Sequence, residues 1–309
     1  MKEKIRSWIR PSSKKTDIFI LAALLSIVLL FIGDIVGELL DLVIPYGKII
    51  ALMSPNEEIA PFATIYTPFL GVWIVFFLFC IVKYNRPMIG KLTLNKRALK
   101  GALIGAVIGF SFNGICILGA ALSGDIKLSL NEINPGLIIF FIIIVCIQSG
   151  AEEITERVYL YQKLRRRYKS PLVAILGNAL IFAAFHAFNP GVTLFSLFSI
   201  FVVGLFYSVL VYYYDCVWVA IMVHTMWNFT QNILFGLPNS GIVSQYSVFK
   251  LDAASARDGF FYSVAFGVEG SYAAVLVDII GIVAVIMLGR GKGEKCDMWA
   301  GDDKSPVNS

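Results

Sequence analysis

Long runs of apolar residues, separated by short polar connections, make up most of the sequence. An α-helix rises about 1.5 Å per residue, so about 20 apolar residues in a row can cross a hydrocarbon core of about 30 Å. Runs of this kind occur at residues 18–44, 62–82, 99–122, 136–160, 171–188, 193–214, 216–235 and 271–289. The pattern therefore predicts an all-α fold, a polytopic integral membrane bundle with about eight transmembrane helices.

Composition agrees with a chain that is dissolved mainly in lipid, because 58% of the 309 residues are hydrophobic, more than a soluble globular chain carries. The first apolar run follows a basic segment, as in a signal peptide, but no small-residue cleavage site comes after it. We therefore expect a retained first helix. The absence of repeats and long linkers predicts a single transmembrane domain at residues 1–290, followed by a polar cytoplasmic tail at 291–309.

Basic residues fall almost entirely on one side of the predicted bundle. With the amino terminus placed inside, all but four of the 26 Lys and Arg residues lie in cytoplasmic segments. Lys and Arg avoid loops that are translocated across a membrane, so we expect both termini in the cytoplasm. The expected membrane is the plasma membrane of a bacterium or archaeon. The net charge of +5 then reflects topology and contact with anionic lipid, and nucleic acid is not an expected partner.

Two features of the sequence receive no assigned chemistry. The five cysteines are scattered, and none of them are paired at the spacing of metal ligands. The longest connection, residues 236–270, is predicted to lie outside the cell. A connection of this length is typical of a lid or a partner surface, and equally of a plain surface loop.

Charged side chains at membrane depth carry the strongest functional signal, since each one costs at least a few kcal/mol. Glu152, Glu153, Glu156 and Arg157 follow a long apolar run within one predicted helix. Glu153 and Arg157 are four residues apart with the acid first, the favourable order for an ion pair on one helical face. Glu152 points about 100° away from Glu153 on the helix, so one carboxylate is expected to be neutralised and the other to be available.

The only two histidines of the chain both fall inside predicted spans. Phe182 and His186 are four residues apart, so the aromatic ring can pack one turn from the imidazole. His224 and Asn228 have the same spacing, which places an imidazole and a carboxamide on one face. Each polar residue also has a plain structural explanation, as a packing histidine, an asparagine that joins two helices, or an acid in the headgroup layer. The joint pattern, downstream of an acid pair, favours a shared site.

This combination of side chains supports hydrolysis. A carboxylate and an imidazole can deprotonate a water molecule, or hold a metal that activates it, while a second imidazole and an amide stabilise an oxyanion. Redox and phosphoryl-transfer chemistry lack their motifs, because the sequence has neither a cysteine cluster nor a glycine-rich phosphate loop. The HExxH, GxSG and GxGD signatures of other intramembrane proteases are absent too.

Three motifs, in order along the chain, resemble those of the CAAX prenyl protease and bacteriocin-processing family, also called Abi or type II CAAX proteases. The motifs EExxxR, FxxxH and HxxxN of that family stand here as Glu152-Glu153 with Arg157, Phe182 with His186, and His224 with Asn228. They occupy separate predicted spans in a catalytic core at about residues 136–235. The resemblance implies an intramembrane endopeptidase that opens to the cytoplasm and cleaves a membrane-associated or lipid-modified peptide.

The resemblance also implies a role for each motif residue. Glu152 and His186 would activate the water, and His224 with Asn228 would stabilise the oxyanion. The supporting residues would be Glu153, Arg157 and Phe182. The catalytic side chains start at different depths if their helices are straight, so we expect tilted or staggered helices that bring Glu152, His186 and His224 together.

Zinc is the one cofactor that this set of residues suggests, and Glu152, His186 and His224 would be its ligands. If the water is bound by glutamate and histidine alone, no cofactor is needed. Two positions depart from the family pattern, because Glu156 and Val158 stand where members often have an aromatic residue and a glycine. Glu156 shares a helical face with Glu152 and can compete for the same water.

Two other classes of function stay open at this point. A non-catalytic protein, giving immunity to a bacteriocin or scaffolding a partner through residues 236–270, is favoured if contact with Glu156 collapses the site. A transporter with a proton relay ranks last, because broken-helix signals and inverted repeats are lacking. The expected partners are a peptide or lipid-modified protein substrate and membrane lipid.

Overall fold

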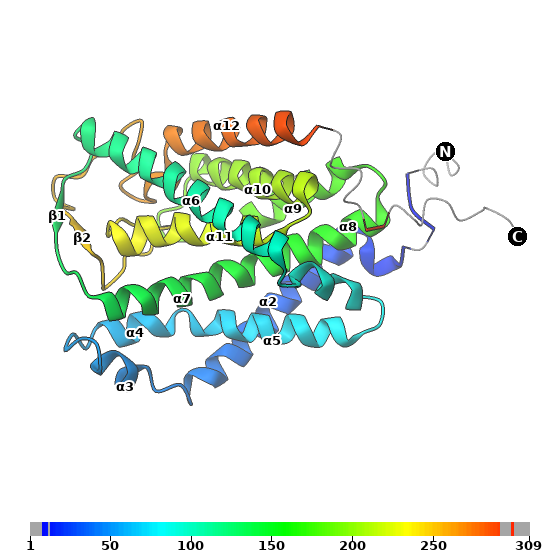
Figure 1. The fold of residues 1–309 in the computed structure, drawn as a ribbon, viewed down its shortest axis with the longest axis horizontal. Helices are drawn as coiled ribbons and strands as arrows, with labels where there is room; N and C mark the ends of the chain where they lie inside the picture. Colours follow the sequence, from blue (N-terminus) through cyan, green and yellow to red (C-terminus); the bar gives the residue numbers. More distant parts are fainter. Residues whose placement is uncertain (1–7, 12, 291–297, 300–309) are drawn as a thin grey trace, which may run out of the picture.

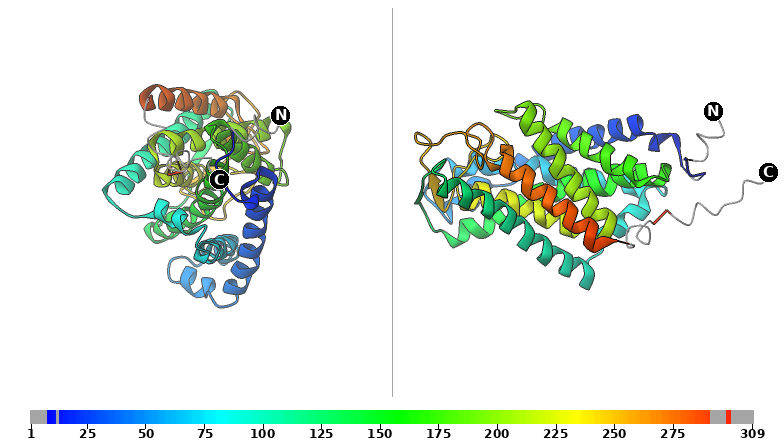
Figure 2. Two further views of the ribbon diagram at one scale, coloured as in Figure 1. Left: turned by 90° about the vertical axis from the view of Figure 1, so that its right-hand side faces the viewer. Right: turned by 90° about the horizontal axis from the view of Figure 1, so that it is seen from above.

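The computed structural model of the protein describes residues 8–11, 13–290 and 298–299. Its long helices run side by side in one bundle (Figures 1 and 2). The main helices are α2 (Phe19–Asp41), α5 (Thr67–Ile81), α6 (Lys96–Leu122), α7 (Pro135–Glu153), α9 (Pro171–Phe185), α10 (Leu194–Tyr214), α11 (Val217–Asn228) and α12 (Tyr272–Gly289). The shorter elements are η1 (Lys15–Asp17), α3 (Tyr46–Ala51), α4 (Ile59–Thr64), η2 (Arg86–Leu92), β1 (Leu128–Leu130), η3 (Ile154–Leu160), α8 (Tyr161–Arg167), η4 (Phe229–Leu234), β2 (Phe249–Leu251) and η5 (Val268–Gly270). The predicted tail at 291–309 lies outside the described residues, apart from 298–299.

The predicted all-α membrane bundle is confirmed. Within the described residues, six helices are long and apolar enough to cross a membrane, with Ile59–Ile81 and Pro135–Arg167 each taken as one. The prediction of about eight spans compares with these six, since α9 has only 15 residues and α11 with its continuation η4 is not among them. α9 ends at Phe185, and the turn that follows it contains Pro190 and Gly191, where proline prevents the helix from resuming in line.

Polar caps and π-helical segments shape the helices around the interior. Asn134 accepts a hydrogen bond from the Leu137 backbone N–H at the start of α7, and Thr193 caps α10 in the same way. Such caps satisfy backbone donors that have no partner inside the helix. The π-helical segment η3 continues α7 into α8, and η4 continues α11. The predicted spans at 136–160 and 216–235 are therefore not plain α-helices over their full length.

The connection between η4 and α12 covers one end of the bundle. Its strand β2 pairs antiparallel with β1, at the same end as α3 and α4 (Figure 1). The first turn of α2 and the last turn of α12 both lie at the opposite end (Figure 1). This placement agrees with an even number of membrane crossings.

Part of the basic stretch that follows α7 is buried in ion pairs. Asp17 of η1 contacts Arg166 at 2.7 Å and Lys163 at 3.3 Å, and the Tyr84 hydroxyl donates to the same carboxylate. Burial alone would raise the pKa of Asp17, but the hydrogen bonds from Arg166 and Tyr84 outweigh it and hold the pKa below its usual value. These contacts fasten the segment before α2 to α8.

α2 and α5 cross with their backbones in contact. A methyl group at Gly71 would overlap the carbonyl oxygen of Gly33 and the nitrogen of Gly37. Only a residue without a Cβ allows this approach. The crossing places Leu30 and Asp34 of α2 beside Phe69 of α5 on the wall of the interior cavity described below.

Replacing Gly71 by alanine is expected to lower the free energy of unfolding by about 1–3 kcal/mol, because overpacking forces the backbones apart. Unfolding by SDS in mixed micelles would measure the change. Gly114→Ala in α6 is the matched control, since nothing lies within 4 Å of its added methyl group and alanine favours a helix over glycine by about 1 kcal/mol. Equal stability of the two variants would contradict the close crossing.

Candidate active site

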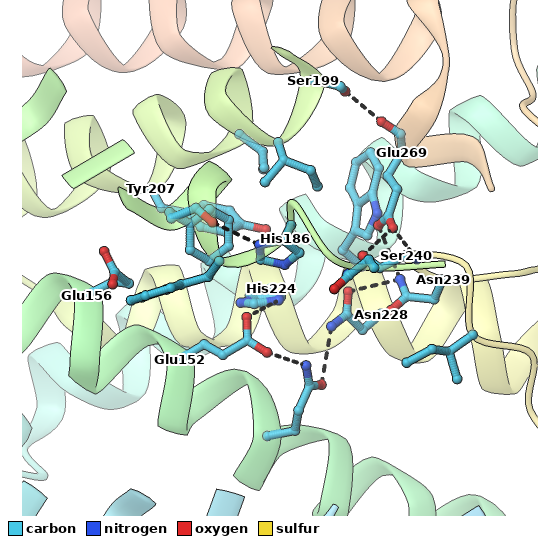
Figure 3. A pocket seen from close by; sticks show the side chains of 18 of the residues that line it. Glu152, Glu156, His186, Ser199, Tyr207, His224, Asn228, Asn239, Ser240 and Glu269 are labelled. Atoms are coloured by element: carbon cyan, nitrogen blue, oxygen red, sulfur yellow. Dashed lines mark hydrogen bonds and ion pairs between the residues drawn. The ribbon is translucent and has the colours of Figure 1, made fainter. Parts of the chain in front are cut away.

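A cavity of about 320 Å³ lies inside the bundle. Glu152 reaches it from α7, His186 from the turn after α9, and His224 and Asn228 from α11 (Figure 3). The structure therefore brings the four residues predicted to act in catalysis to the wall of one cavity. Part of the remaining wall is apolar, with Leu30, Phe69, Phe185, Ile200, Val203 and Ala274, and the carboxylates of Asp34 and Asp278 also line it.

The two neighbouring glutamates have different surroundings. The Glu153 side chain is fully buried and Glu152 is 18% exposed, into the cavity. Arg157 Nη1 donates to Glu153 Oε1 at 3.1 Å, as predicted from their spacing. Glu153 is thus neutralised inside the protein, while Glu152 keeps an oxygen available for the cavity contents.

Arg157 is enclosed by aromatic rings as well as by its carboxylate partner. Its guanidinium carbon lies 4.4 Å from the centre of the Phe182 ring and 5.1 Å from that of Tyr207. Nη2 donates to the Gly204 carbonyl oxygen at 3.3 Å. Cation–π contacts of this kind strengthen when the cation is shielded from water, so Arg157 joins η3 to α9 and α10.

His224 is held between the two glutamates. Its Nδ1 lies 3.1 Å from Glu153 Oε1, and its Nε2 lies 3.8 Å from Glu152 Oε2. A carboxylate can only accept a hydrogen bond, so the proton of this bond sits on Nδ1 and Nε2 is left to face the cavity. The buried pair of Glu153 and Arg157 thereby sets the orientation of the imidazole.

His186 is the first residue beyond α9 and terminates that helix. Its Nδ1 is 2.8 Å from the Phe182 carbonyl oxygen, which accepts the Nδ1 proton and leaves Nε2 free for the cavity. The centre of the Phe182 ring lies 4.8 Å from the centre of the His186 ring and 6.1 Å from that of the His224 ring. The predicted packing of Phe182 against His186 is confirmed, and the same ring also contacts the second histidine.

Gln148 is a member of the site that the sequence analysis did not identify. Its Nε2 donates to Glu152 Oε1 at 2.6 Å, and its Oε1 accepts from Asn228 Nδ2 at 3.3 Å. The side chain therefore connects the two ends of the polar cluster. Its position one helical turn before Glu152 could have predicted this contact, because residues four apart share a helical face.

Residues of the long connection at 236–270 also reach the cavity, and sequence spacing gave no sign of this. Asn239 Nδ2 donates to Asn228 Oδ1 and to Glu269 Oε2, each at 3.2 Å. The Ser240 hydroxyl and backbone N–H both donate to Glu269 Oε1. Burial raises the pKa of Glu269 to about 7, although the hydrogen bonds from Ser240 oppose the rise.

Glu156, which departs from the family pattern, does not bind Glu152. Its Oε2 accepts a 2.7 Å hydrogen bond from Asn178 Nδ2, and the Ser208 hydroxyl holds the other end of that amide at 2.8 Å. No hydrogen bond joins Glu156 to Glu152 in the described part of the chain, and the two side chains lie apart in Figure 3. Val158 is fully buried in the apolar core next to α2 and α5.

The proposed zinc ligands are of the right chemical types for a metal site, but they are not arranged as one. His186 and His224 each have Nδ1 engaged and Nε2 facing the cavity, an arrangement that metal-binding histidines commonly show. Over the residues that the structure describes, however, no group of three or more His, Cys, Asp or Glu side chains is arranged to hold a metal ion. As they are placed here, Glu152, His186 and His224 therefore do not form a metal site.

Comparison with known families gives one match. Residues 134–230 match the family model described as type II CAAX prenyl endopeptidase, Rce1-like. The matched segment begins at the cap of α7 and ends two residues beyond Asn228, so it contains all three motifs. The curated proteins and the solved structures yielded no match. Residues 134–230 are thus similar to the type II CAAX prenyl endopeptidase family, within a chain whose apolar helices are those of an integral membrane protein.

Proposed function

We propose that the protein is an intramembrane endopeptidase that cleaves a membrane-associated or lipid-modified peptide. The observation that carries the proposal is the position of Glu152, His186, His224 and Asn228 around one cavity inside a membrane bundle. The family match covers all four residues and supports peptide-bond hydrolysis.

The reaction begins with a water molecule between Glu152 and His186. Glu152 takes a proton from the water as its oxygen attacks the scissile carbonyl carbon. Asn228 Nδ2 and the Nε2–H of a doubly protonated His224 face the cavity near Glu152, where they donate to the oxyanion of the tetrahedral intermediate. The C–N bond then breaks, and the proton passes from Glu152 to the leaving nitrogen.

A lipid-modified or membrane-embedded substrate suits the remainder of the cavity. Its wall includes Leu30 and Phe69 from α2 and α5 and Ile200 and Val203 from α10. These apolar side chains lie next to the polar cluster, so one cavity can bind an apolar segment and hold its peptide bond at Glu152. We further propose that both ends of the chain lie in the cytoplasm, as the distribution of basic residues indicates.

The test is cleavage of a panel of lipid-anchored and leader-bearing peptides by purified protein in detergent. Wild type is compared with Glu152→Ala and His186→Ala, each with and without a metal chelator. We expect cleavage by the wild type and loss of cleavage in both variants. Inhibition by the chelator would support a catalytic zinc, and full activity in chelator would exclude one.

Two results would count against the proposal. Cleavage that survives both substitutions would place the activity elsewhere in the preparation or the chain. A folded wild type that cleaves no member of the panel would favour the alternative of a non-catalytic immunity or scaffold protein.

A further inference from the structure

We propose that Asn239 is a positioning residue, which orients the Asn228 carboxamide so that its N–H bonds face the reacting carbonyl. The inference rests on the proposed function and assigns a catalytic contribution to the long connection between η4 and α12. The family model ends at residue 230, so this connection lies outside the matched segment.

The orientation of Asn228 matters because its side chain has a donor end and an acceptor end of the same shape. An oxyanion is stabilised by the Nδ2 end and repelled by the Oδ1 end. The side chain therefore needs a fixed orientation. Gln148 alone does not fix it, because the Gln148 amide can itself rotate.

A chain of hydrogen bonds from Glu269 supplies this fixed orientation. An ionised carboxylate accepts only, so the Asn239 Nδ2 group must face Glu269 Oε2, at 3.2 Å. The same Nδ2 group donates to Asn228 Oδ1, also at 3.2 Å. The acceptor end of Asn228 is thereby occupied, and its Nδ2 end donates to Gln148 Oε1, whose own amide nitrogen donates to Glu152.

The backbone around Asn239 holds it in place for this task. Asn239 exchanges two backbone hydrogen bonds of 2.9 Å with Ile242, which closes a tight turn. Ser240, inside the turn, has a φ of 47°, a left-handed conformation that is uncommon for residues other than glycine. This conformation directs both the N–H and the hydroxyl of Ser240 at Glu269 Oε1.

The turn is also packed against the segment that carries His186. A Cβ at Gly241 would overlap the carbonyl oxygen of Pro190, four residues after His186. The turn therefore contacts both sides of the site, Asn228 through a side-chain hydrogen bond and the His186 turn through the backbone.

The test is a double-mutant cycle of Asn239→Ala and Asn228→Ala, assayed above the pKa of Glu269. Asn228→Ala removes an oxyanion donor and is expected to lower kcat by about 10²- to 10³-fold. Asn239→Ala is expected to lower kcat by about tenfold, with little change in KM. In the Asn228→Ala background, Asn239→Ala is expected to have no further effect, because it acts through Asn228.

Asn131→Ala is the matched control, because Asn131 Nδ2 donates to the Ser247 carbonyl oxygen of the same connection without touching the cavity. It should leave kcat unchanged, and the unfolding midpoints of all variants should be compared. A further tenfold loss in the Asn228→Ala background, or unchanged kcat in Asn239→Ala, would overturn the inference alone. Full activity of Asn228→Ala and Glu152→Ala would instead overturn the proposed function, and the inference with it.

Discussion

Replacing Glu152 by glutamine should lower kcat for peptide cleavage by about 10²- to 10⁴-fold, because the amide cannot take the proton of the attacking water. The amide oxygen can still accept the hydrogen bond from Gln148 that Glu152 Oε1 receives at 2.6 Å. The cavity therefore keeps its shape, and KM should change little. Steady-state kinetics with the best peptide of the panel would measure both constants.

Glu156→Gln is the matched control for this substitution. It makes the same chemical change one helical turn further on, at a buried side chain whose partner Asn178 can donate to an amide oxygen equally well. We expect this variant to keep kcat within a few fold of wild type. If Glu156→Gln is the inactive variant and Glu152→Gln the active one, the assignment of the two acids is wrong.

Replacing Arg157 by methionine should lower the free energy of unfolding by about 3–5 kcal/mol, because it leaves the buried Glu153 without its cation. Both side chains of this pair are fully buried, with Nη1 and Oε1 3.1 Å apart. The contacts of the guanidinium with Phe182 and Tyr207 are lost as well. SDS unfolding in mixed micelles, read by circular dichroism, would give the change.

Two comparisons make this result specific to the buried pair. Arg257→Met removes a side chain that is 65% exposed and lies 3.6 Å from Asp125, so we expect a change within about 1 kcal/mol. Adding Glu153→Leu to Arg157→Met removes the unpaired charge, and the double variant should be more stable than Arg157→Met alone. If the double variant is less stable than Arg157→Met alone, the contact of Glu153 with His224 stabilises the fold by more than the unpaired charge of Glu153 destabilises it.

Much of the fold follows from hydrophobic length, while the breaks in the helices do not. The predicted span at 62–82 is divided between α4 and α5, although its apolar pattern is continuous. The π-helical segments η3 and η4 were also missed, since apolar residues all around a membrane helix leave no periodicity from which to see a change of winding. Pro190 and Gly191, by contrast, did predict that the helix before them would end.

The part of the site that could be predicted is the part built from single helices. Glu153 with Arg157 and Phe182 with His186 each lie four residues apart, and both contacts are found. Asn239 and Glu269 could not be predicted, because 30 residues separate them and neither shares a helix with Asn228. Their contacts depend on how the connection folds back over the bundle, a property of tertiary packing.

The number of residues in each π-helical segment affects the geometry of the site. η3 begins directly after Glu153 and η4 directly after Asn228, and bonds from i to i+5 accommodate one residue more than bonds from i to i+4. Deleting a residue early in η3, such as Thr155, would allow plain α-helical winding and keep α7 in line with α8. It would also bring Arg157 one position closer to Glu153, a rotation of about 100° around the helix. A relative shortened by one residue at this point would therefore retain the bundle and every catalytic side chain, yet hold His224 differently.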